Sequence, residues 1–431
     1  MTDGTVRVGL LGCGIVGGAA ARILMERRDD ISRRAGIPVE LARVAVRDPS
    51  KARHIDVGAE RLTGDAWSVV HDPNIDVVVE TIGGIQPSRD LLLAAFASGK
   101  PAVTANKELL STHGQEVMDA ADDAGVDFLF EASVGGGIPI IRPLKESLAG
   151  DRVVRVMGIV NGTTNFILTR MSETGCSFQA ALGEAERLGY TELDPSADID
   201  GFDAAAKLAI LSSIAFNARV VADDVGREGI STVSERDITA AHELGYEIKL
   251  LGVAETGEGA VTARVYPAML PQDHPLASVR DVFNAVFVEG EESGELMFFG
   301  RGAGGGPSGA AVVGDIVQIA HNLVTGGRSV GCTCYGPAKL RPQEDVPVRY
   351  YIVLSVADRP GVLAEVAGVF ARHEISIASV RQEGAGEEAT LVAITHTATE
   401  GQHRATFAEL GALGTVKSVD STLRVEGTHE R

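Results

Sequence analysis

The densest group of ionisable residues lies between positions 186 and 207, where six acids precede a lysine. Asp203 and Lys207 are four residues apart, so a helix would place both on one face. Surface ion pairs of helices show the same spacing. Here, however, Ala204–Ala206 and Leu208–Leu211 make the helix apolar, which predicts that Lys207 lies near a buried face. Burial lowers the pKa of a lysine, so this lysine could exchange protons near neutral pH.

A second chemical signal is the pattern Gly12-x-Gly14-x-x-Gly17, which follows a strand-like run and opens a helical one. In a dinucleotide site the first glycine makes a tight turn and the second lets the backbone approach a pyrophosphate. The third lets the helix pack closely on the strand, and Ile15 and Val16 lie at the helix N-terminus that faces the phosphates. The pattern in this context predicts a dinucleotide site, with a glycine-rich turn without ligand as the alternative.

The residues after the second strand-like run bear on the choice of cofactor. The chain has Arg47 and Asp48 there, with Lys51 and Arg53 nearby. An NAD site usually carries an acid at this point to hold the ribose 2′-hydroxyl, whereas an arginine suits a 2′-phosphate. The sequence therefore favours NADP(H) over NAD(H). There are two alternatives. Asp48 could turn inward and keep NAD(H) open as the cofactor, or Arg47 could be a solvated turn residue without a role in binding.

Alternating strand and helix patterns over the first 130 residues must position this site. Strands are expected at 6–11, 39–46, 75–80, 102–104 and 128–130, and helices at 15–28, 91–97 and 108–124. Such alternation implies an α/β domain with a Rossmann-type, doubly wound parallel sheet covered on both faces.

The rest of the chain has a mixed α+β pattern and then a compact tail. Strands are expected at 152–159, 261–266 and 282–290, and helices at 184–188, 204–215 and 310–324, the last after a glycine-rich turn at 300–309. Residues 326–347 are typical of a linker. The tail is expected to run strand 349–356, helix 362–373, strand 375–382, strand 390–397, helix 402–410 and strand 416–425. This order is ferredoxin-like.

Composition excludes several classes of protein. The 431 residues include 39 basic and 59 acidic ones, a net charge of −20, which disfavours binding to nucleic acid or to an anionic membrane. No run of about 18 apolar residues predicts a membrane span, and Arg22 interrupts the apolar stretch near the start. Four cysteines suit a cytoplasmic chain with reduced thiols, and the spacing of Cys332 and Cys334 lacks partners for zinc.

Six segments resemble homoserine dehydrogenases in their monofunctional bacterial form with a regulatory tail. They read Gly-Cys-Gly-Ile-Val-Gly at 12–17, Thr-Ala-Asn-Lys at 104–107, Glu-Ala-Ser-Val-Gly-Gly-Gly-Ile-Pro-Ile at 131–140, Asn-Gly-Thr-Thr-Asn-Phe-Ile-Leu at 161–168, Leu-Gly-Tyr-Thr-Glu at 188–192 and Asp-x-Asp-Gly-x-Asp-x-x-x-Lys at 198–207. The resemblance implies reversible reduction of L-aspartate 4-semialdehyde to L-homoserine with NAD(P)H, on the route to threonine, methionine and isoleucine.

The resemblance also implies roles for individual residues of the substrate site. Lys207 would donate a proton to the developing alkoxide, and Lys107 would bind or polarise the same oxygen and share the proton work. Glu192 and Asp203 would hold the substrate ammonium, with Asp198 in support.

Further matches to the family concern the cofactor and a cation. Thr104, Lys107, Gly189 and Gly305 match contacts of the nicotinamide nucleotide. A sodium ion would be held largely by backbone carbonyls of four residues in one loop, a donor set that suits a hard cation. These are Glu131, Val134, Gly136 and Ile138. A glycine-rich hinge that holds no ion is the alternative.

The position of Gly305 implies that the chain returns to its first domain. We therefore expect a discontinuous nucleotide domain of residues 1–131 and about 303–340, and a catalytic and dimerisation domain of residues 132–302. Residues 348–431 would form the regulatory domain.

The tail resembles an ACT domain at the turn between its first strand and helix, where Asp358 precedes Gly361. Amides at that helix start could face an amino-acid carboxylate. The resemblance implies inhibition by L-threonine, with a purely dimerising module as the alternative. Because such domains usually pair, we expect a homodimer or homotetramer.

Two other classes compete with this interpretation. An aspartate-semialdehyde dehydrogenase needs a cysteine that forms a thioester beside a base, and Cys176 has no obvious histidine partner. A non-enzymatic regulator that binds nucleotide and amino acid would not need Glu192, Asp203 and Lys207 together.

Overall fold

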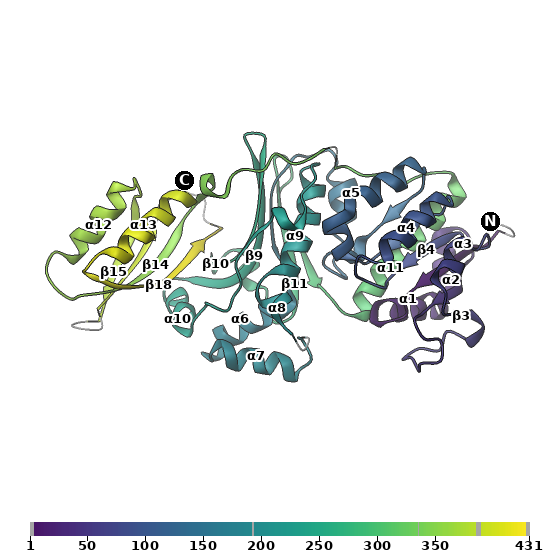
Figure 1. The fold of residues 1–431 in the computed structure, drawn as a ribbon, viewed down its shortest axis with the longest axis horizontal. Coiled ribbons are helices and arrows are strands. Elements are labelled where there is room, and N and C mark those ends of the chain that lie inside the picture. Colours follow the sequence, from purple (N-terminus) through teal and green to yellow (C-terminus); the bar gives the residue numbers. More distant parts are fainter. Residues whose placement is uncertain (1–3, 192–193, 335, 385–388, 428–431) are drawn as a thin grey trace. The chain divides into compact units, whose positions relative to one another are not determined.

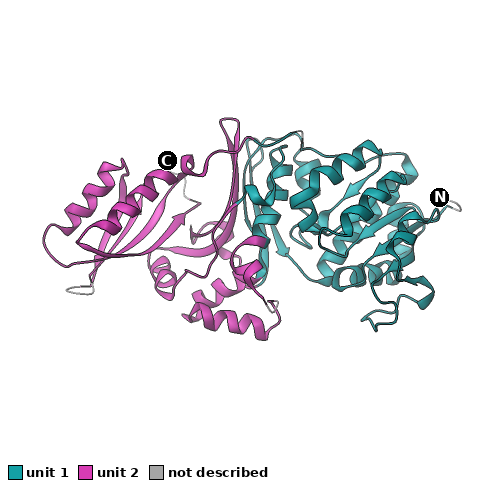
Figure 2. Ribbon diagram, viewed as in Figure 1, with its two compact units in different colours: residues 1–162, 203–225, 282–338 teal, residues 163–202, 226–281, 339–431 magenta. Residues whose placement is uncertain are grey.

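The computed structural model describes residues 4–191, 194–334, 336–384 and 389–427. Contacts divide the chain into two compact units, shown in Figure 2. Unit 1 comprises residues 1–162, 203–225 and 282–338, and unit 2 comprises residues 163–202, 226–281 and 339–431. No helix in the described part of the chain has the length and apolar character needed to cross a membrane.

Unit 1 contains a six-stranded sheet whose strands are ordered β3-β2-β1-β4-β5-β6 and run parallel. Its strands are β1 (Val6–Leu11), β2 (Val39–Ala45), β3 (Leu62–Thr63), β4 (Val77–Glu80), β5 (Ala102–Thr104) and β6 (Phe128–Leu129). This order is that of the doubly wound dinucleotide-binding fold. The prediction of a Rossmann-type sheet is confirmed.

Helices cover both faces of this sheet (Figure 1). They are α1 (Ile15–Glu26), α2 (Arg28–Ala35), α3 (Ala66–His71), α4 (Ser88–Ala97), α5 (Lys107–Asp123) and α11 (Gly305–Thr325). Apolar residues of α1, α2 and α11 form one core with the sheet, so a helix from far along the chain completes the N-terminal fold. Helices α3, α4 and α5 pack in sequence beside one another.

The predicted glycine-rich turn at 300–309 was wrong in its second half, because α11 already begins at Gly305. The glycines there serve close packing. A Cβ atom at Gly305 would lie 3.0 Å from the Ile15 carbonyl oxygen, and one at Gly309 would lie 2.8 Å from the Ala19 Cβ atom. The absence of side chains lets α11 approach α1.

Unit 1 also holds an antiparallel set of strands and the helix with the predicted lysine. These elements are β7 (Val153–Ile159), β11 (Phe283–Gly290), β12 (Gly294–Arg301) and α9 (Phe202–Ala215). Strand β11 pairs with both β7 and β12. Two short turns, η2 (Glu131–Ser133) and η3 (Pro143–Ser147), lead into β7.

Unit 2 contains a helical part, a long hairpin and the tail. Its first elements are α6 (Gly162–Thr174), α7 (Phe178–Arg187), α8 (Ser196–Ile199), β8 (Gly226–Arg227), α10 (Glu235–Glu243), β9 (Tyr246–Gly257) and β10 (Ala260–Pro271). The tail contains β13 (Pro347–Val348), β14 (Tyr350–Val356), α12 (Val362–Arg372), β15 (Ile377–Glu383), β16 (Thr390–Thr395), β17 (Ala398–Thr399), α13 (Glu400–Ala412) and β18 (Val416–Val425).

The tail strands are ordered β18-β14-β16-β15 and pair antiparallel, with α12 and α13 packed into the same core. The predicted ferredoxin-like tail is confirmed. Sequence patterns did not show that β18 also pairs in parallel with β10, which joins the tail to the hairpin of unit 2.

Candidate active site

The loop between β1 and α1 has the backbone that a dinucleotide site requires. Gly12 has φ +93°, and a Cβ atom there would lie 2.8 Å from the Thr81 carbonyl oxygen. A Cβ atom at Gly17 would lie 2.2 Å from the Gly12 carbonyl oxygen, whereas one at Gly14 would meet nothing within 4 Å. The first and third glycines are thus needed for packing, and the second leaves the backbone open to a ligand.

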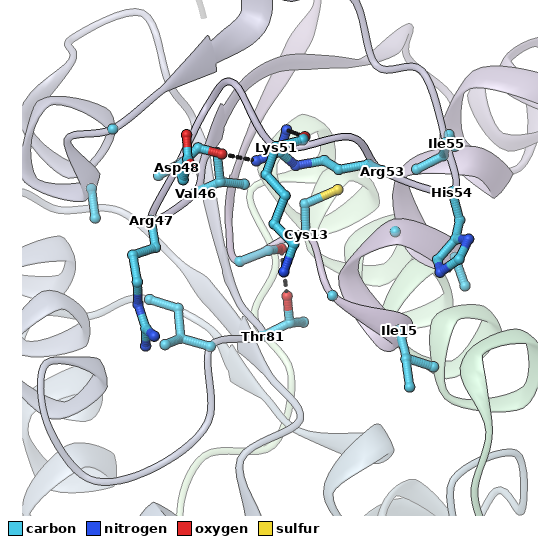
Figure 3. Close-up of a pocket in the computed structure, with 18 of the residues that line it drawn as sticks. Cys13, Ile15, Val46, Arg47, Asp48, Lys51, Arg53, His54, Ile55 and Thr81 are labelled. Atoms are coloured by element: carbon cyan, nitrogen blue, oxygen red, sulfur yellow. Dashed lines mark hydrogen bonds between the residues drawn. The ribbon is translucent and has the colours of Figure 1, made fainter. Parts of the chain in front are cut away.

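This loop borders a cavity of about 940 Å³, which Figure 3 shows in close-up. Ile15, at the start of α1, lines the cavity and is 78% exposed. Arg47, Lys51 and Arg53 line the same cavity from the segment after β2. The cavity therefore joins a helix N-terminus to three cationic side chains, which suits a phosphorylated ligand.

The Asp48 carboxylate points into its own turn. Its Oδ1 atom accepts hydrogen bonds from the Ser50 amide at 2.9 Å and the Ser50 hydroxyl at 2.6 Å. These bonds hold the pKa of the carboxyl below its ordinary value. Arg53 donates to the Lys51 carbonyl oxygen at 2.7 Å and so braces the segment. Among the described residues, no ion pair engages Arg47.

At the carboxyl ends of β4 and β5, a buried acid organises the backbone. Glu80 accepts hydrogen bonds from the Thr104 hydroxyl at 2.6 Å, the Ile82 amide at 2.7 Å and the Gly83 amide at 3.0 Å. Thr104 is fully buried. Gly305 lies against Ile15, so the structure brings the second glycine-rich segment to the first.

Lys107, Asp203 and Lys207 form one cluster within unit 1. Asp203 Oδ1 lies 2.5 Å from Lys107 Nζ, and Asp203 Oδ2 lies 2.7 Å from Lys207 Nζ. Lys207 also donates to the Val160 carbonyl oxygen at 2.7 Å, and the Asn161 amide donates to Asp203 Oδ2 at 2.9 Å. Lys107 begins α5, Asp203 and Lys207 lie in the first two turns of α9, and Val160 and Asn161 directly follow β7.

Burial differs between the two lysines. Asp203 and Lys207 are 8% exposed, which confirms the predicted burial of Lys207, while the Lys107 side chain is 45% exposed. Burial alone would raise the pKa of the Asp203 carboxyl, but Lys207 and Lys107 hold it well below its ordinary value. An ionised carboxylate thus fixes two ammonium groups, one buried and one partly exposed.

The remaining predicted substrate and cofactor residues belong to unit 2 or fall outside the described residues. Gly189 has φ +73° just after α7, and Asp198 lies in α8. Glu192 lies outside the described residues. Sequence reasoning assigned no role to Asn161, although this residue begins one of the recognised motifs.

The loop at 131–138 is tightly built. Glu131 is buried, and its carboxylate accepts hydrogen bonds from the Ile140 amide at 2.6 Å and the Ile141 amide at 2.8 Å. Gly136 has φ +52°, and a Cβ atom there would lie 2.6 Å from the Gly302 carbonyl oxygen. Within the described ranges, no group of three His, Cys, Asp or Glu side chains is placed to hold a metal ion.

The tail has a pocket of about 350 Å³ at the turn between β14 and α12. Gly361, with φ +96°, is the residue before α12, and residues 356–363 form most of the lining. Asp358 accepts a hydrogen bond from the Gln382 amide at 3.4 Å, which links this turn to β15. A cavity therefore lies at the turn where the sequence predicts an amino-acid site.

The sheet order, the open glycine loop and the lysine–carboxylate cluster define a dinucleotide-dependent dehydrogenase. Matches to family models agree with this class and name a specific family. Residues 12–131 match the NAD-binding domain of homoserine dehydrogenase, residues 139–317 match homoserine dehydrogenase, and residues 350–414 match the ACT domain.

Relatives cover nearly the whole chain. Homoserine dehydrogenases of Corynebacterium glutamicum and Mycobacterium tuberculosis are each 48% identical to it, over 98% of this chain and 96% and 98% of theirs. The crystal structure of a homoserine dehydrogenase from Thiobacillus denitrificans superposes with a TM-score of 0.93 at 40% identity, covering 98% of both chains. A hyperthermophilic archaeal homoserine dehydrogenase in complex with NADPH has a TM-score of 0.62 at 28% identity, covering 73% of this chain and 97% of that one.

The chain belongs to the homoserine dehydrogenase family and is an oxidoreductase that uses a nicotinamide cofactor. The resemblance carried by the six sequence segments is confirmed. The two competing classes, a thioester-forming dehydrogenase and a non-enzymatic regulator, find no support in these matches.

Proposed function

We propose that this protein catalyses the reversible NADP(H)-dependent conversion of L-aspartate 4-semialdehyde to L-homoserine, on the route to threonine, methionine and isoleucine. The observation that carries the proposal is the cluster of Lys107, Asp203 and Lys207, which places two ammonium groups on one buried carboxylate. Incubation with the aldehyde and NADPH, followed by chromatography, tests it. Homoserine, formed as NADPH is oxidised, is the expected product. Unchanged aldehyde and NADPH would contradict the proposal, as would an acyl phosphate formed in a parallel incubation of the aldehyde with NADP+ and inorganic phosphate.

Each lysine has a distinct role in this proposal. The bound nicotinamide supplies or accepts the hydride. Lys107, the more exposed lysine, binds the substrate oxygen, and Lys207 donates the proton that turns the alkoxide into the alcohol. In the reverse direction the same lysine accepts that proton. The Val160 carbonyl and Asp203 hold Lys207 in place.

The substrate ammonium is assigned by resemblance to Glu192 and Asp203, with Asp198 in support. Both oxygens of Asp203 already lie beside lysines, so the contacts support a positioning role for this carboxylate as well. The two roles differ in their kinetic effect: loss of an ammonium contact raises the KM for the aldehyde, whereas loss of lysine positioning lowers kcat.

The cavity residues support NADP(H) as the preferred cofactor. Gly12, Gly14, Ile15, Val16 and Gly17 would hold the pyrophosphate, with Thr104, Lys107, Gly189 and Gly305 toward the nicotinamide. Arg47 would hold the 2′-phosphate. The Asp48 carboxylate is held within its own turn by hydrogen bonds from Ser50.

Replacing Arg47 by alanine is expected to lower the ratio of kcat/KM for NADPH to that for NADH about tenfold or more, because a charged hydrogen bond to phosphate is lost. Initial rates with each cofactor measure the ratio. Arg34→Ala, an exposed change in α2, is the matched control and should leave the ratio unchanged. An unchanged ratio in Arg47→Ala would show that this arginine is a solvated turn residue.

The loop at 131–138 is proposed to hold a sodium ion through carbonyl oxygens of Glu131, Val134, Gly136 and Ile138. In the described structure, the oxygens of Val134, Gly136 and Ile138 accept no backbone hydrogen bond from other segments. If an ion fills the loop, replacing sodium by choline at constant ionic strength should lower activity several-fold in a saturable way. Equal activity in both salts would favour an ion-free hinge.

We propose that L-threonine binds the tail pocket and inhibits the enzyme, and that the chain forms a homodimer or homotetramer in the cytoplasm. The pocket at Gly361 supports the first statement, and the free cysteines support a reducing compartment. We also propose the domain division expected from the sequence. Residues 1–131 and about 303–340 would form the nucleotide domain, residues 132–302 the catalytic and dimerisation domain, and residues 348–431 the regulatory domain.

A further inference from the structure

Within unit 2, the tail is joined to the β9–β10 hairpin by strand pairing as well as by the chain connection. Strand β18 pairs in parallel with β10, with Arg424 opposite Ala268 and Val425 opposite Met269. The Glu426 amide donates to the Met269 carbonyl oxygen at 2.9 Å. The tail sheet therefore continues the β9–β10 hairpin. A movement of β14 or β18 would displace the hairpin through this strand pairing.

A buried network of charges lies at this junction. The Arg424 side chain is 8% exposed and donates two hydrogen bonds of 2.8 Å to the two oxygens of Glu228. The same guanidinium donates to Glu400 at 2.8 and 3.2 Å. Arg264 also approaches Glu400, at 3.4 Å. Arg424 thus connects β18 and α13 of the tail to the segment after β8.

The network also contacts the strand that leads to the tail pocket. Tyr350, at the start of β14, donates its hydroxyl hydrogen to Glu400 at 2.7 Å, and the Arg424 guanidinium lies 5.3 Å from its ring centroid. Strand β14 ends at Val356, which lines the pocket. One strand of seven residues therefore runs from the pocket to the network.

On its other side, the network contacts the segment that leads to the catalytic helix. The Glu228 amide donates to the Val265 carbonyl oxygen at 2.7 Å, and the Ile230 amide donates to the Ile199 carbonyl oxygen at 2.9 Å. A Cβ atom at Gly229 would lie 2.4 Å from that same Ile199 oxygen, so residues 228–230 pack tightly against the end of α8. Ile199 ends α8, four positions before Asp203 in the sequence.

We propose that the bidentate Arg424–Glu228 ion pair couples amino-acid binding in the tail pocket to the segment at 198–203 that leads into the catalytic cluster. The inference rests on the proposed inhibition by threonine and names its route. Glu228 is the weaker anchor, since its side chain is 56% exposed, whereas Glu400 is 10% exposed. A shift of β14 and β18 would change the Arg424–Glu228 contact first and with it the position of residues 228–230. This coupling requires that threonine bind more tightly to the inhibited state of the chain than to the active state.

Glu228→Gln in the full-length protein tests the proposal, because it removes the charge, keeps the shape and leaves the buried Arg424–Glu400 pair intact. Glu409→Gln is the matched control, since Glu409 pairs with Arg372 and His373 within the tail. Two quantities are measured: threonine affinity by calorimetry, and the threonine concentration that halves homoserine oxidation. In Glu228→Gln this concentration should rise about tenfold, with affinity and uninhibited kcat within about threefold of the parent. The control should match the parent.

A double-mutant cycle adds a second readout. Arg424→Lys keeps the charge but loses the planar fork that engages both oxygens of Glu228. The double variant should weaken inhibition no more than Arg424→Lys alone, because the contact that Glu228→Gln breaks is already lost in that variant. Parental inhibition in Glu228→Gln would overturn the proposal, as would loss of threonine binding in that variant. A parent protein that binds no threonine in calorimetry would instead contradict the proposed regulation itself.

Discussion

Replacing Lys207 by methionine is expected to lower kcat for aldehyde reduction by a factor of about 10³, the usual size of a lost general acid. Methionine preserves much of the length and bulk of the side chain but supplies no proton. The KM for NADPH should change little, because the lysine lies in the cluster with Asp203 and Val160. Initial rates at saturating substrate measure kcat, and NADPH fluorescence confirms that the variant still binds cofactor.

Lys107→Met is the matched comparison for this prediction. Because Lys107 is the more exposed lysine and is assigned to bind the oxygen, its loss should raise the KM for the aldehyde as well as lower kcat. If Lys107→Met shows the larger fall in kcat and Lys207→Met retains more than about a tenth of parental activity, the two roles must be exchanged.

Replacing Asp203 by asparagine is expected to lower the free energy of unfolding by about 3 kcal/mol, because removal of one partner of a buried ion pair leaves charge uncompensated. Two ammonium groups would then face each other across a neutral amide. Urea denaturation at pH 7 measures the loss. Asp200→Asn, an exposed change three positions earlier, is the control and should stay within about 0.5 kcal/mol of the parent.

The same carboxylate predicts how stability changes with pH. Its pKa is depressed in the folded protein, because Lys207 and Lys107 outweigh the effect of burial. A depressed pKa contributes stability that is fully present above the unfolded value of about 4 and is lost as pH falls below it. The difference in stability between parent and Asp203→Asn should therefore narrow progressively as the pH falls from about 4 to 2. A gap that stays constant over this range would show that the ion pairs do not stabilise the fold.

Asp203→Asn also separates the two roles proposed for this residue. A positioning role predicts a fall in kcat of about a hundredfold or more, since both lysines lose their anchor. A role confined to the substrate ammonium predicts a raised KM for the aldehyde with kcat nearly unchanged. The measurement uses protein at a temperature where the variant is still folded by circular dichroism.

Sequence patterns predicted the elements whose apolar periodicity is strong. Strands β1, β2, β4 and β5 are short apolar runs between turns, and they lie where expected. Helix α2 was not predicted, because residues 28–35 are mostly charged and only Ile31 and Ala35 are buried. Strand β12 was also missed, since most of its residues are half-buried or exposed. Both omissions arise because these elements bury few apolar side chains.

The candidate site was predictable where its residues are near one another in sequence. Asp203 and Lys207 could be paired by helical spacing, and the glycine loop by its pattern. Lys107 could be placed near a ligand by its position after a parallel strand. Its pairing with Asp203 could not be predicted, because the contact spans 96 positions. The Asn161–Asp203 and Arg424–Glu228 contacts are tertiary in the same way, the latter linking residues 196 positions apart. No local pattern carries such pairings.

The most direct test of the account follows the absorbance of NADPH, and separately of NADH, on addition of L-aspartate 4-semialdehyde to the parent protein and to Lys207→Met. We expect aldehyde-dependent oxidation by the parent, faster with NADPH, and a rate about 10³-fold lower in the variant. Equal rates in the two proteins would contradict the proton-transfer role of Lys207. Absence of oxidation of either cofactor by the parent would contradict the proposed reaction.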